Sequence, residues 1–207
     1  MAGHDGTVEA VGVAGYAHFL ALAQRSQWDE NAVELTVHGW TSGRRQLLAN
    51  LCMAETAVAE ELDPIIAVAP PEARRCLELQ RGDEERHARF FARYATVIDT
   101  PEPDDDWRQR FEVELPRVAR TGNLREAVGL YHHVLEAAVL KPALQALDGV
   151  AGVDLVVRDE RWHIGLGLRL LTDLGVPQRE ILATTRAARS RRWEQSPRGR
   201  FSRASLQ

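Results

Sequence analysis

Residues 83–91 read "DEERHARFF", and this stretch decides the fold together with residues 159–164, "DERWHI". Each stretch contains a Glu followed three positions later by a His, and the two pairs are Glu84 with His87 and Glu160 with His163. Residues three apart lie on one face of a helix, so each pair can direct a carboxylate and an imidazole at the same point. A single short motif of this kind arises easily by chance. The residues that face the two pairs must therefore decide whether they form a site.

The composition of the 207-residue chain is that of one globular domain, with 44% hydrophobic and 27% charged residues. No uninterrupted apolar run approaches the ~20 residues that a membrane helix needs. The first ten residues, "MAGHDGTVEA", lack the basic and apolar regions of a secretory signal, and two cysteines are too few for a disulfide framework. We therefore expect a single cytoplasmic domain over residues 1–207 with no membrane span.

The charge of the chain is distributed unevenly. A net charge of −4 argues against a general nucleic-acid binder, which needs a positive surface for the phosphates. From Val176 to Gln207, however, eight Arg stand against two Glu. The simpler interpretation is a solvated helix followed by a frayed terminus. The alternative is a contact surface for an acidic partner or for an anionic group of a substrate.

Apolar residues recur at intervals of three and four and seldom at two, which predicts an all-α chain. Four long helices are expected, and the first of them should fade near Pro64; they cover about 43–67, 71–97, 124–147 and 153–174. Shorter helices are expected at about 14–26, 107–120 and 178–194, and the last leads into a basic tail that ends at residue 207. Long helices joined in pairs by short turns predict an antiparallel four-helix bundle with flanking helices.

The helical hairpins predict which residues face the two Glu–His pairs. A hairpin that turns near residue 69 places Glu55 opposite the first pair, and one that turns near residue 150 places Glu136 within a residue of the second. Both acids lie in apolar stretches, "LCMAETAVA" and "VLEAAVL", where a carboxylate buried alone must be neutralised, paired or bound to a metal. The core is thus expected to bring together six side chains: Glu55, Glu84, His87, Glu136, Glu160 and His163.

Four carboxylates and two imidazoles of this arrangement form the dinuclear metal site of ferritin-like bundles. Carboxylate oxygens and one imidazole per metal suit iron and manganese, whereas structural zinc usually takes a Cys-rich ligand set. Taken singly, each residue would fit a surface charge on an amphipathic helix; the agreement of both hairpin registers favours the site. The sequence therefore predicts two metal ions as cofactor, Fe/Fe or Mn/Fe.

Other polar residues near the six are expected to play lesser parts. Glu60, Glu61, Asp83 and Glu85 are expected to be solvated or to support the ligands from behind. His132 lies four residues before Glu136 on the same helix face, and its simplest role is that of a buried histidine with its hydrogen bonds satisfied.

Five stretches then match a known family: "SQWDENAVEL", "AETAVAEEL", "DEERHARFF", "LYHHVLEAAVL" and "VRDERWHIGLGLRLL". Through them the chain resembles the ribonucleotide reductase small-subunit superfamily and, within it, the ligand-binding oxidases related to that subunit. The resemblance spans about residues 26–175 and implies a ferritin-like bundle that uses O₂ as co-substrate. It also implies that Trp28 and Asp159 form a hydrogen-bonded path for electrons and protons to His87.

Further positions distinguish the branches of that superfamily. The reductase subunit places its radical Tyr four residues after the first motif's His, where this chain has Phe91. The ligand-binding oxidases carry a Val and a Tyr that can become covalently joined, and Val58 and Tyr131 match them. Over five residues an ideal helix turns about 500°, which would leave Tyr131 about 140° from Glu136. A π-bulge between them would bring both onto one face; otherwise Tyr131 lines a helix interface.

The resemblance and the residues together predict an O₂-activating dinuclear oxidase or oxygenase that acts on a small, partly apolar organic substrate. Phe91, Tyr131, Val58 and Leu166 are the expected pocket walls. We also expect an electron donor as partner and a homodimer. Two alternatives stay open: a tailoring N- or C-oxygenase of an amine or other metabolite, and a ferritin-like protein that oxidises and handles metal without an organic substrate.

Overall fold

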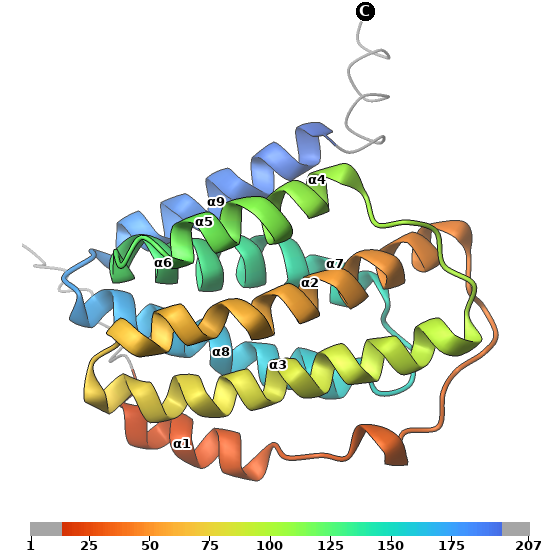
Figure 1. Cartoon of the computed structure of the whole chain (residues 1–207), viewed down its shortest axis with the longest axis horizontal. Helices are drawn as coiled ribbons and strands as arrows, with labels where there is room; N and C mark the ends of the chain where they lie inside the picture. Colours follow the sequence, from red (N-terminus) through yellow and green to blue (C-terminus); the bar gives the residue numbers. More distant parts are fainter. Residues whose placement is uncertain (1–13, 196–207) are drawn as a thin grey trace, which may run out of the picture.

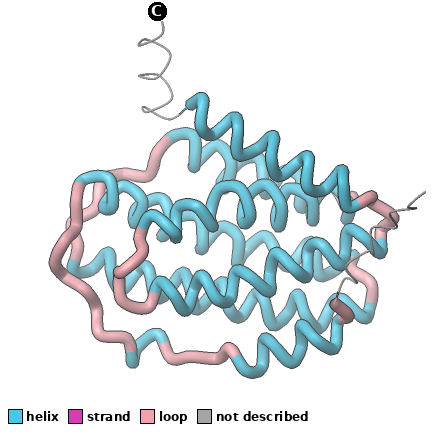
Figure 2. The backbone as a smooth tube through the Cα atoms, turned by 180° about the vertical axis from the view of Figure 1, so that it is seen from behind, coloured by secondary structure: helices cyan, strands magenta, loops and turns pink. Residues whose placement is uncertain are grey.

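The computed structural model describes residues 14–195, and within this range the backbone forms helices and loops without a strand. The long helices pack as an antiparallel bundle, with the loops gathered toward its two ends (Figures 1 and 2). The predicted all-α, ferritin-like four-helix bundle is confirmed. Its long helices are α2 (Ser42–Val68), α3 (Pro71–Val97), α8 (Val153–Asp173) and a composite of α6 (Leu124–Val128), a π-helical segment (Gly129–Leu140) and α7 (Lys141–Ala146).

Shorter helices flank the bundle. The first, α1 (Tyr16–Arg25), packs against α3 and α8 on one side, and a 3₁₀ turn (Glu30–Ala32) follows it. On the other side lie α9 (Gln178–Gln195) and a helix made of α4 (Asp105–Arg108), a π-helical segment (Gln109–Glu114) and α5 (Leu115–Ala119). The predicted helix at 107–120 thus begins two residues earlier and changes its hydrogen-bond pattern in the middle. The basic tail predicted beyond residue 195 lies outside the described residues.

Local signals in the sequence explain where the long helices begin and end. Thr41 caps α2, because its hydroxyl accepts a hydrogen bond from the amide of Arg44 at 3.3 Å. Pro71 occupies the first turn of α3, where a missing amide proton costs nothing. The expected weakening of α2 near Pro64 was wrong, because the helix continues to Val68. The burial of Ile65 supplies packing that holds this last turn in place.

The third long helix owes its shape to the π-helical segment Gly129–Leu140. A π-helix bonds each amide to a carbonyl five residues earlier, so it carries more residues per turn than an α-helix and shifts the faces that follow. Most of this segment is buried, including Tyr131 and Glu136. The π geometry that the spacing of these two residues required is therefore present in the bundle core.

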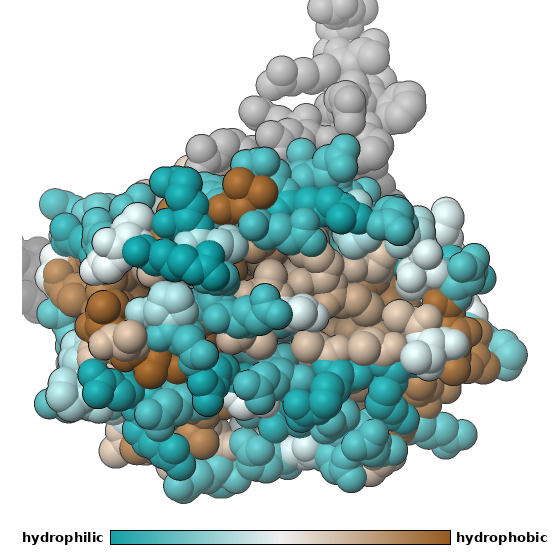
Figure 3. Space-filling view, viewed as in Figure 1, coloured by the Kyte–Doolittle hydropathy of each residue, from teal (hydrophilic) through white to brown (hydrophobic). Residues whose placement is uncertain are grey.

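The core runs the length of the bundle, and its largest members are fully buried aromatic and aliphatic side chains such as Tyr94, Phe90, Phe111 and Leu135. The surface in Figure 3 is hydrophilic over most of its area, with a weakly apolar band across the middle. None of the helices within residues 14–195 combines the length and apolar character that crossing a membrane requires.

Replacing Gly152 with Ala should destabilise the fold more than replacing Gly149 with Ala. Both glycines have positive φ values, 82° and 81°, so each variant has a backbone cost of about 1–2 kcal/mol. A Cβ at residue 152 would also lie 2.8 Å from the Phe90 ring and 2.9 Å from Val33, whereas one at residue 149 meets nothing within 4 Å. The clash should lower the free energy of unfolding in urea by a further ~1–3 kcal/mol. Equal losses in the two variants would contradict this expectation.

Candidate metal centre

The six predicted ligands come from all four long helices and meet inside the bundle. Glu55 is on α2, Glu84 and His87 are on α3, Glu136 is on the π-helical segment, and Glu160 and His163 are on α8. All six side chains are removed from solvent, with exposed fractions of 0–1%. The structure thus brings together the side chains that the hairpin registers placed opposite one another. Their binding of metal stays a prediction.

Two groups of potential ligand atoms form around these residues, and Glu84 belongs to both. One group contains Glu55, Glu84, His87 and Glu160, and the other contains Glu84, Glu136 and His163. Within each group, one ligand atom per residue lies within 4.8 Å of every other. His87 Nδ1 is 3.3 Å from Glu84 Oε2, and His163 Nδ1 is 3.0 Å from Glu84 Oε1. The carboxylate of Glu84 therefore stands between the two imidazoles.

Glu160 also lies between the two histidines. Its Oε1 atom is 3.6 Å from Nδ1 of His87 and 3.6 Å from Nδ1 of His163. On the outer sides, Glu55 Oε2 is 3.6 Å from His87 Nδ1, while Glu136 belongs only to the group around His163. The arrangement offers two adjacent positions, each with its own histidine and terminal carboxylate and with two carboxylates shared.

Unpartnered atoms show that the donor set fits two metal ions. Each of the six side chains has at least one buried nitrogen or oxygen without a hydrogen-bond partner; these atoms are Oε1 and Oε2 of Glu55, Oε2 of Glu84, Nδ1 of His87, Oε2 of Glu136, Oε1 and Oε2 of Glu160, and Nδ1 of His163. A buried polar atom left unpaired costs about 1–3 kcal/mol. Atoms of this kind that face one another are suited to ligate iron or manganese.

The charges of the cluster are strongly perturbed in the metal-free chain. Burial raises the pKa of Glu55 to about 8, and burial with the nearby charge of Glu160 raises the pKa of Glu136 well above its ordinary range. Burial alone would also raise the pKa of Glu84, but the two imidazoles beside it hold that pKa well below its ordinary value. Protons therefore balance part of the carboxylate charge in the metal-free chain.

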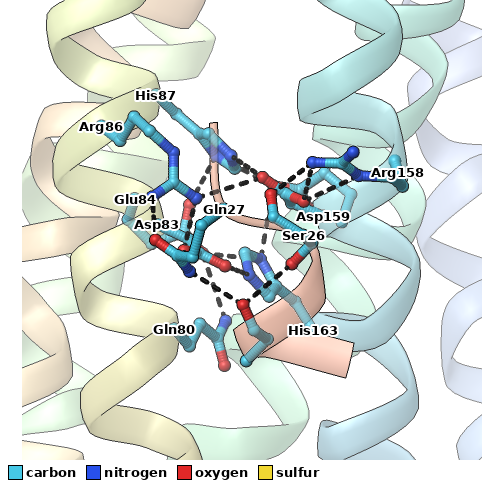
Figure 4. Close-up of polar contacts among 12 residues, drawn as sticks. Ser26, Gln27, Gln80, Asp83, Glu84, Arg86, His87, Arg158, Asp159 and His163 are labelled. Carbon is cyan, nitrogen blue, oxygen red and sulfur yellow. Dashed lines mark hydrogen bonds and ion pairs between the residues drawn. The ribbon is translucent and has the colours of Figure 1, made fainter. Parts of the chain in front are cut away.

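The far side of each histidine is held by an aspartate from the opposite helix. Asp159 on α8 places Oδ2 3.4 Å from Nε2 of His87 on α3, and Asp83 on α3 places Oδ2 3.5 Å from Nε2 of His163 on α8. Arg86 joins them, because its guanidinium donates to both aspartates (Figure 4). Such contacts fix the orientation of a ligating imidazole and raise its basicity.

Asp83, which was expected to be solvated or to support the ligands from behind, lies behind His163, and the sequence carries a signal for this position. Both motifs read Asp-Glu-x-x-His, so Asp83 precedes Glu84 as Asp159 precedes Glu160. Of the other nearby acids, Glu60 and Glu85 are exposed, and Glu61 is buried in an ion pair with Arg120. Asp83 is thus the one acid of these four that contacts a histidine of the centre.

Trp28 contacts this arrangement through Asp159, His87 and Arg86, whose guanidinium lies over the indole at 5.3 Å from the ring centroid. Its indole Nε1 donates to Asp159 Oδ2 at 2.8 Å, and its ring lies 6.3 Å from that of His87, centroid to centroid. Burial alone would raise the pKa of Asp159, but hydrogen bonds from His87 and Trp28 hold it at about 2. The chain Trp28–Asp159–His87 is therefore a continuous set of polar contacts, and its transport of electrons stays a prediction.

Tyr131 reaches the centre from the π-helical segment. Its hydroxyl lies 3.4 Å from Glu84 Oε1 and 3.3 Å from the backbone oxygen of Val58. The side chains of Tyr131 and Val58 are fully buried, as are those of Phe91 and Leu166, the other two predicted pocket walls. The π geometry thus places Tyr131 beside the carboxylates, where an ideal α-helix would have turned it away.

One uncharged residue beside the carboxylates, Gln80, was not identified from the sequence. Gln80 donates to Glu136 Oε1 at 2.7 Å and to Glu84 Oε1 at 3.2 Å, and its own oxygen lies 3.1 Å from Nε2 of His132. The available signal was the position of Gln80 one helical turn before Glu84. Glutamine carries no charge that would mark it as costly to bury, so the pattern of acids and histidines did not include it.

No family model and no curated protein matches the sequence. Solved structures do match: an R2-like ligand-binding oxidase with aerobically reconstituted Mn/Fe cofactor is 16% identical at a TM-score of 0.68, covering 93% of this chain and 82% of that one. A valine-to-leucine mutant of such an oxidase is 17% identical at a TM-score of 0.71, with the same coverage. This chain has the fold of the R2-like ligand-binding oxidases. In this chain, the four long helices of that fold carry the six buried ligand candidates.

In the metal-free protein, Glu55→Gln should increase stability at pH 8 more than at pH 5. The folded chain holds the pKa of Glu55 at about 8, above the ~4.3 of an unfolded glutamate. The folded state then binds the extra proton, so this group makes folding less favourable as pH rises from about 4.3 to 8. The glutamine side chain of the variant does not titrate. The free energy of unfolding of the variant in urea, relative to that of the wild type, should therefore increase across that pH range.

The exposed Glu60 on the same helix provides the control, since Glu60→Gln should leave the pH profile of stability unchanged. Parallel profiles for the wild type and Glu55→Gln would show that the carboxyl group of Glu55 is not held in a perturbed state.

Proposed function

We propose that this chain binds two transition-metal ions, Fe/Fe or Mn/Fe, and uses O₂ to oxidise a small, partly apolar organic substrate. The observation that carries the proposal is the set of unpartnered, fully buried ligand atoms on the six converging side chains. The fold supports it, because the matched oxidases are described with a Mn/Fe cofactor. The proposed ligands are Glu55, Glu84, His87, Glu136, Glu160 and His163.

The residues divide into two terminal sets and a shared pair. His87 and Glu55 would hold one ion, His163 and Glu136 the other, and Glu84 with Glu160 would contact both. A bound pair of such ions supplies reversible redox chemistry and activation of O₂. The chain contributes fixed positions for the ligands and side chains that shield them from solvent.

Trp28 and Asp159 provide the proposed route for electrons from a donor. Asp159 links the indole of Trp28 to the ring of His87 through one carboxylate oxygen. Arg158 donates to the other oxygen of Asp159 at 3.3 Å and also lines a cavity of about 360 Å³ between α1 and α8. Exposed Arg25 and Arg161 line the same cavity, so an acidic donor surface would be complementary there.

The substrate would lie against the apolar side of the centre. Phe91, Val58 and Leu166 offer no charge or hydrogen-bonding side chain, so the part of the substrate next to them should be apolar. Phe91 also occupies the place where a reductase subunit has its radical Tyr. A tailoring oxygenase of an amine or other metabolite would use the same centre. The identity of the compound that the protein oxidises distinguishes this alternative from the proposed oxidase.

Tyr131 and Val58 are proposed to join when the loaded centre reacts with O₂. A bond from the Tyr131 hydroxyl oxygen to a Val58 side-chain carbon would release two hydrogens, with O₂ as the electron acceptor. The contact of the Tyr131 hydroxyl with the Val58 backbone supports the approach of the two residues. The buried position of both excludes competing reaction with solvent.

Metal analysis tests the centre directly. The wild-type protein loaded anaerobically with Fe²⁺ should hold about two metal ions per chain. Glu84→Ala removes the carboxylate common to both ligand groups and should lose most of this metal, while Glu85→Ala alters an exposed neighbour and should keep it. Wild-type protein that remains metal-free after loading would overturn the proposed function.

Oxygen uptake separates an organic oxidase from a metal-handling protein. The reduced, metal-loaded chain should consume O₂ repeatedly only with an electron donor and an organic substrate present. Continued uptake driven by added Fe²⁺ alone, with mineral accumulation, would favour the metal-handling alternative instead.

Intact mass tests the proposed joining of Val58 and Tyr131. Protein loaded with iron in air should weigh two hydrogens less than an anaerobic sample, and its tryptic peptide with Tyr131 should be linked to the one with Val58. Tyr131→Phe lacks the hydroxyl and should keep its full mass. An unchanged wild-type mass after aerobic loading would reject the bond and leave the metal centre standing.

A further inference from the structure

Gln80 occupies the space between two of the proposed ligands. It lies on α3 one turn before Glu84 (Figure 4). Its side chain is completely buried. Its amide nitrogen donates to Oε1 of Glu136 at 2.7 Å and to Oε1 of Glu84 at 3.2 Å. Both protons of the amide are thereby directed at carboxylates. For Glu136 this leaves a single oxygen, Oε2, without a partner.

His132 fixes which way the amide of Gln80 points. The Nε2 atom of His132 lies 3.1 Å from Oε1 of Gln80. An amide oxygen only accepts hydrogen bonds, so this contact requires the tautomer of His132 in which Nε2 carries the proton. Burial, reinforced by the neighbouring His133, lowers the pKa of His132 to about 3, so the ring is neutral. A flip of the amide would turn its oxygen toward two carboxylates and its nitrogen toward a donor, losing all three contacts.

Gly167 on α8 makes room for His132. A Cβ built at residue 167 would overlap Cβ and Cγ of His132, far inside the separation that two carbon atoms can adopt. The helix can therefore approach this ring only where it has no side chain. Gly167, His132 and Gln80 form a continuous line of contacts from α8 to the carboxylate of Glu136.

We propose that Gln80 is a positioning residue that holds Glu136 as a ligand through one oxygen. This inference rests on the proposed function, since it concerns how the ion beside His163 is held. With Oε1 engaged by the amide, Glu136 would bind an ion through Oε2 alone. A metal ion bound beside His163 would thereby keep room for a small exogenous ligand.

Two variants disturb the contacts from Gly167 through His132 and Gln80 to Glu136, each at a different residue. Gln80→Leu keeps the volume but removes the amide, which frees Oε1 of Glu136. Gly167→Ala leaves every polar group in place but displaces His132, which should release the amide from its orientation. Gly82→Ala is the control on α3, because a Cβ there meets nothing within 4 Å.

The test uses full-length protein loaded with iron and oxidised, with azide as the probe of an open position. Wild type and all three variants should hold about two metal ions per chain. In Gln80→Leu the absorption band of bound azide should require about tenfold or more azide, within the effect usual for residues behind a ligand. Gly167→Ala should shift azide affinity in the same direction, and Gly82→Ala should match the wild type.

Infrared spectra supply a second readout that a purely structural role would not move. On metal loading, the separation between the two carboxylate stretching bands should shrink in Gln80→Leu, as expected when a carboxylate binds through both oxygens. Wild-type azide affinity and unchanged bands in a fully loaded Gln80→Leu would overturn the proposal, as would loss of metal from both Gln80→Leu and Gly167→Ala. A wild-type chain without metal would instead remove the proposed function itself.

Discussion

The structure depends on the cost of enclosing four carboxylates in one apolar core. A helical bundle gains stability from burying apolar surface, and an uncompensated charge at its centre opposes that gain. In this chain the opposing charges converge so closely that protons on two histidines offset part of them, while several oxygens stay without a partner. The remaining core is apolar around this cluster and holds it together. The four carboxylates that could hold a cation therefore lower the stability of the metal-free fold.

Helix periodicity made the long helices and the facing acids predictable from the sequence. The spacing of apolar residues identified the long helices within a few residues, and the turns between them identified Glu55 and Glu136 as the facing acids. These inferences succeed because an antiparallel hairpin converts sequence distance into height along the bundle. Asp159 and Trp28 were found through the family resemblance, and their contacts are those it implies.

Other features could not be derived from periodicity. The continuation of α2 through Pro64 depends on the packing of its last turn, which local preference for helix breaking does not include. Gln80 and His132 form contacts between two helices whose relative rotation is set by the π-helical segment. Such a rotation shifts every later residue on that helix, and no spacing rule fixes its extent in advance. The need for a π-bulge could be inferred only because Tyr131 and Glu136 had been matched as a pair.

The crossed aspartates have a consequence for how the two halves of the centre differ. Asp83 and Asp159 support the histidines in nearly mirrored fashion, so the repeated motif builds two cradles of similar shape. The indole of Trp28 donates a hydrogen bond to Asp159, and the hydroxyl of Tyr131 approaches the shared Glu84 from another helix. The two supports therefore have different surroundings, although the motif that builds them is repeated. These two aromatic rings add to the difference between the two ligand groups, one of which contains four residues and the other three.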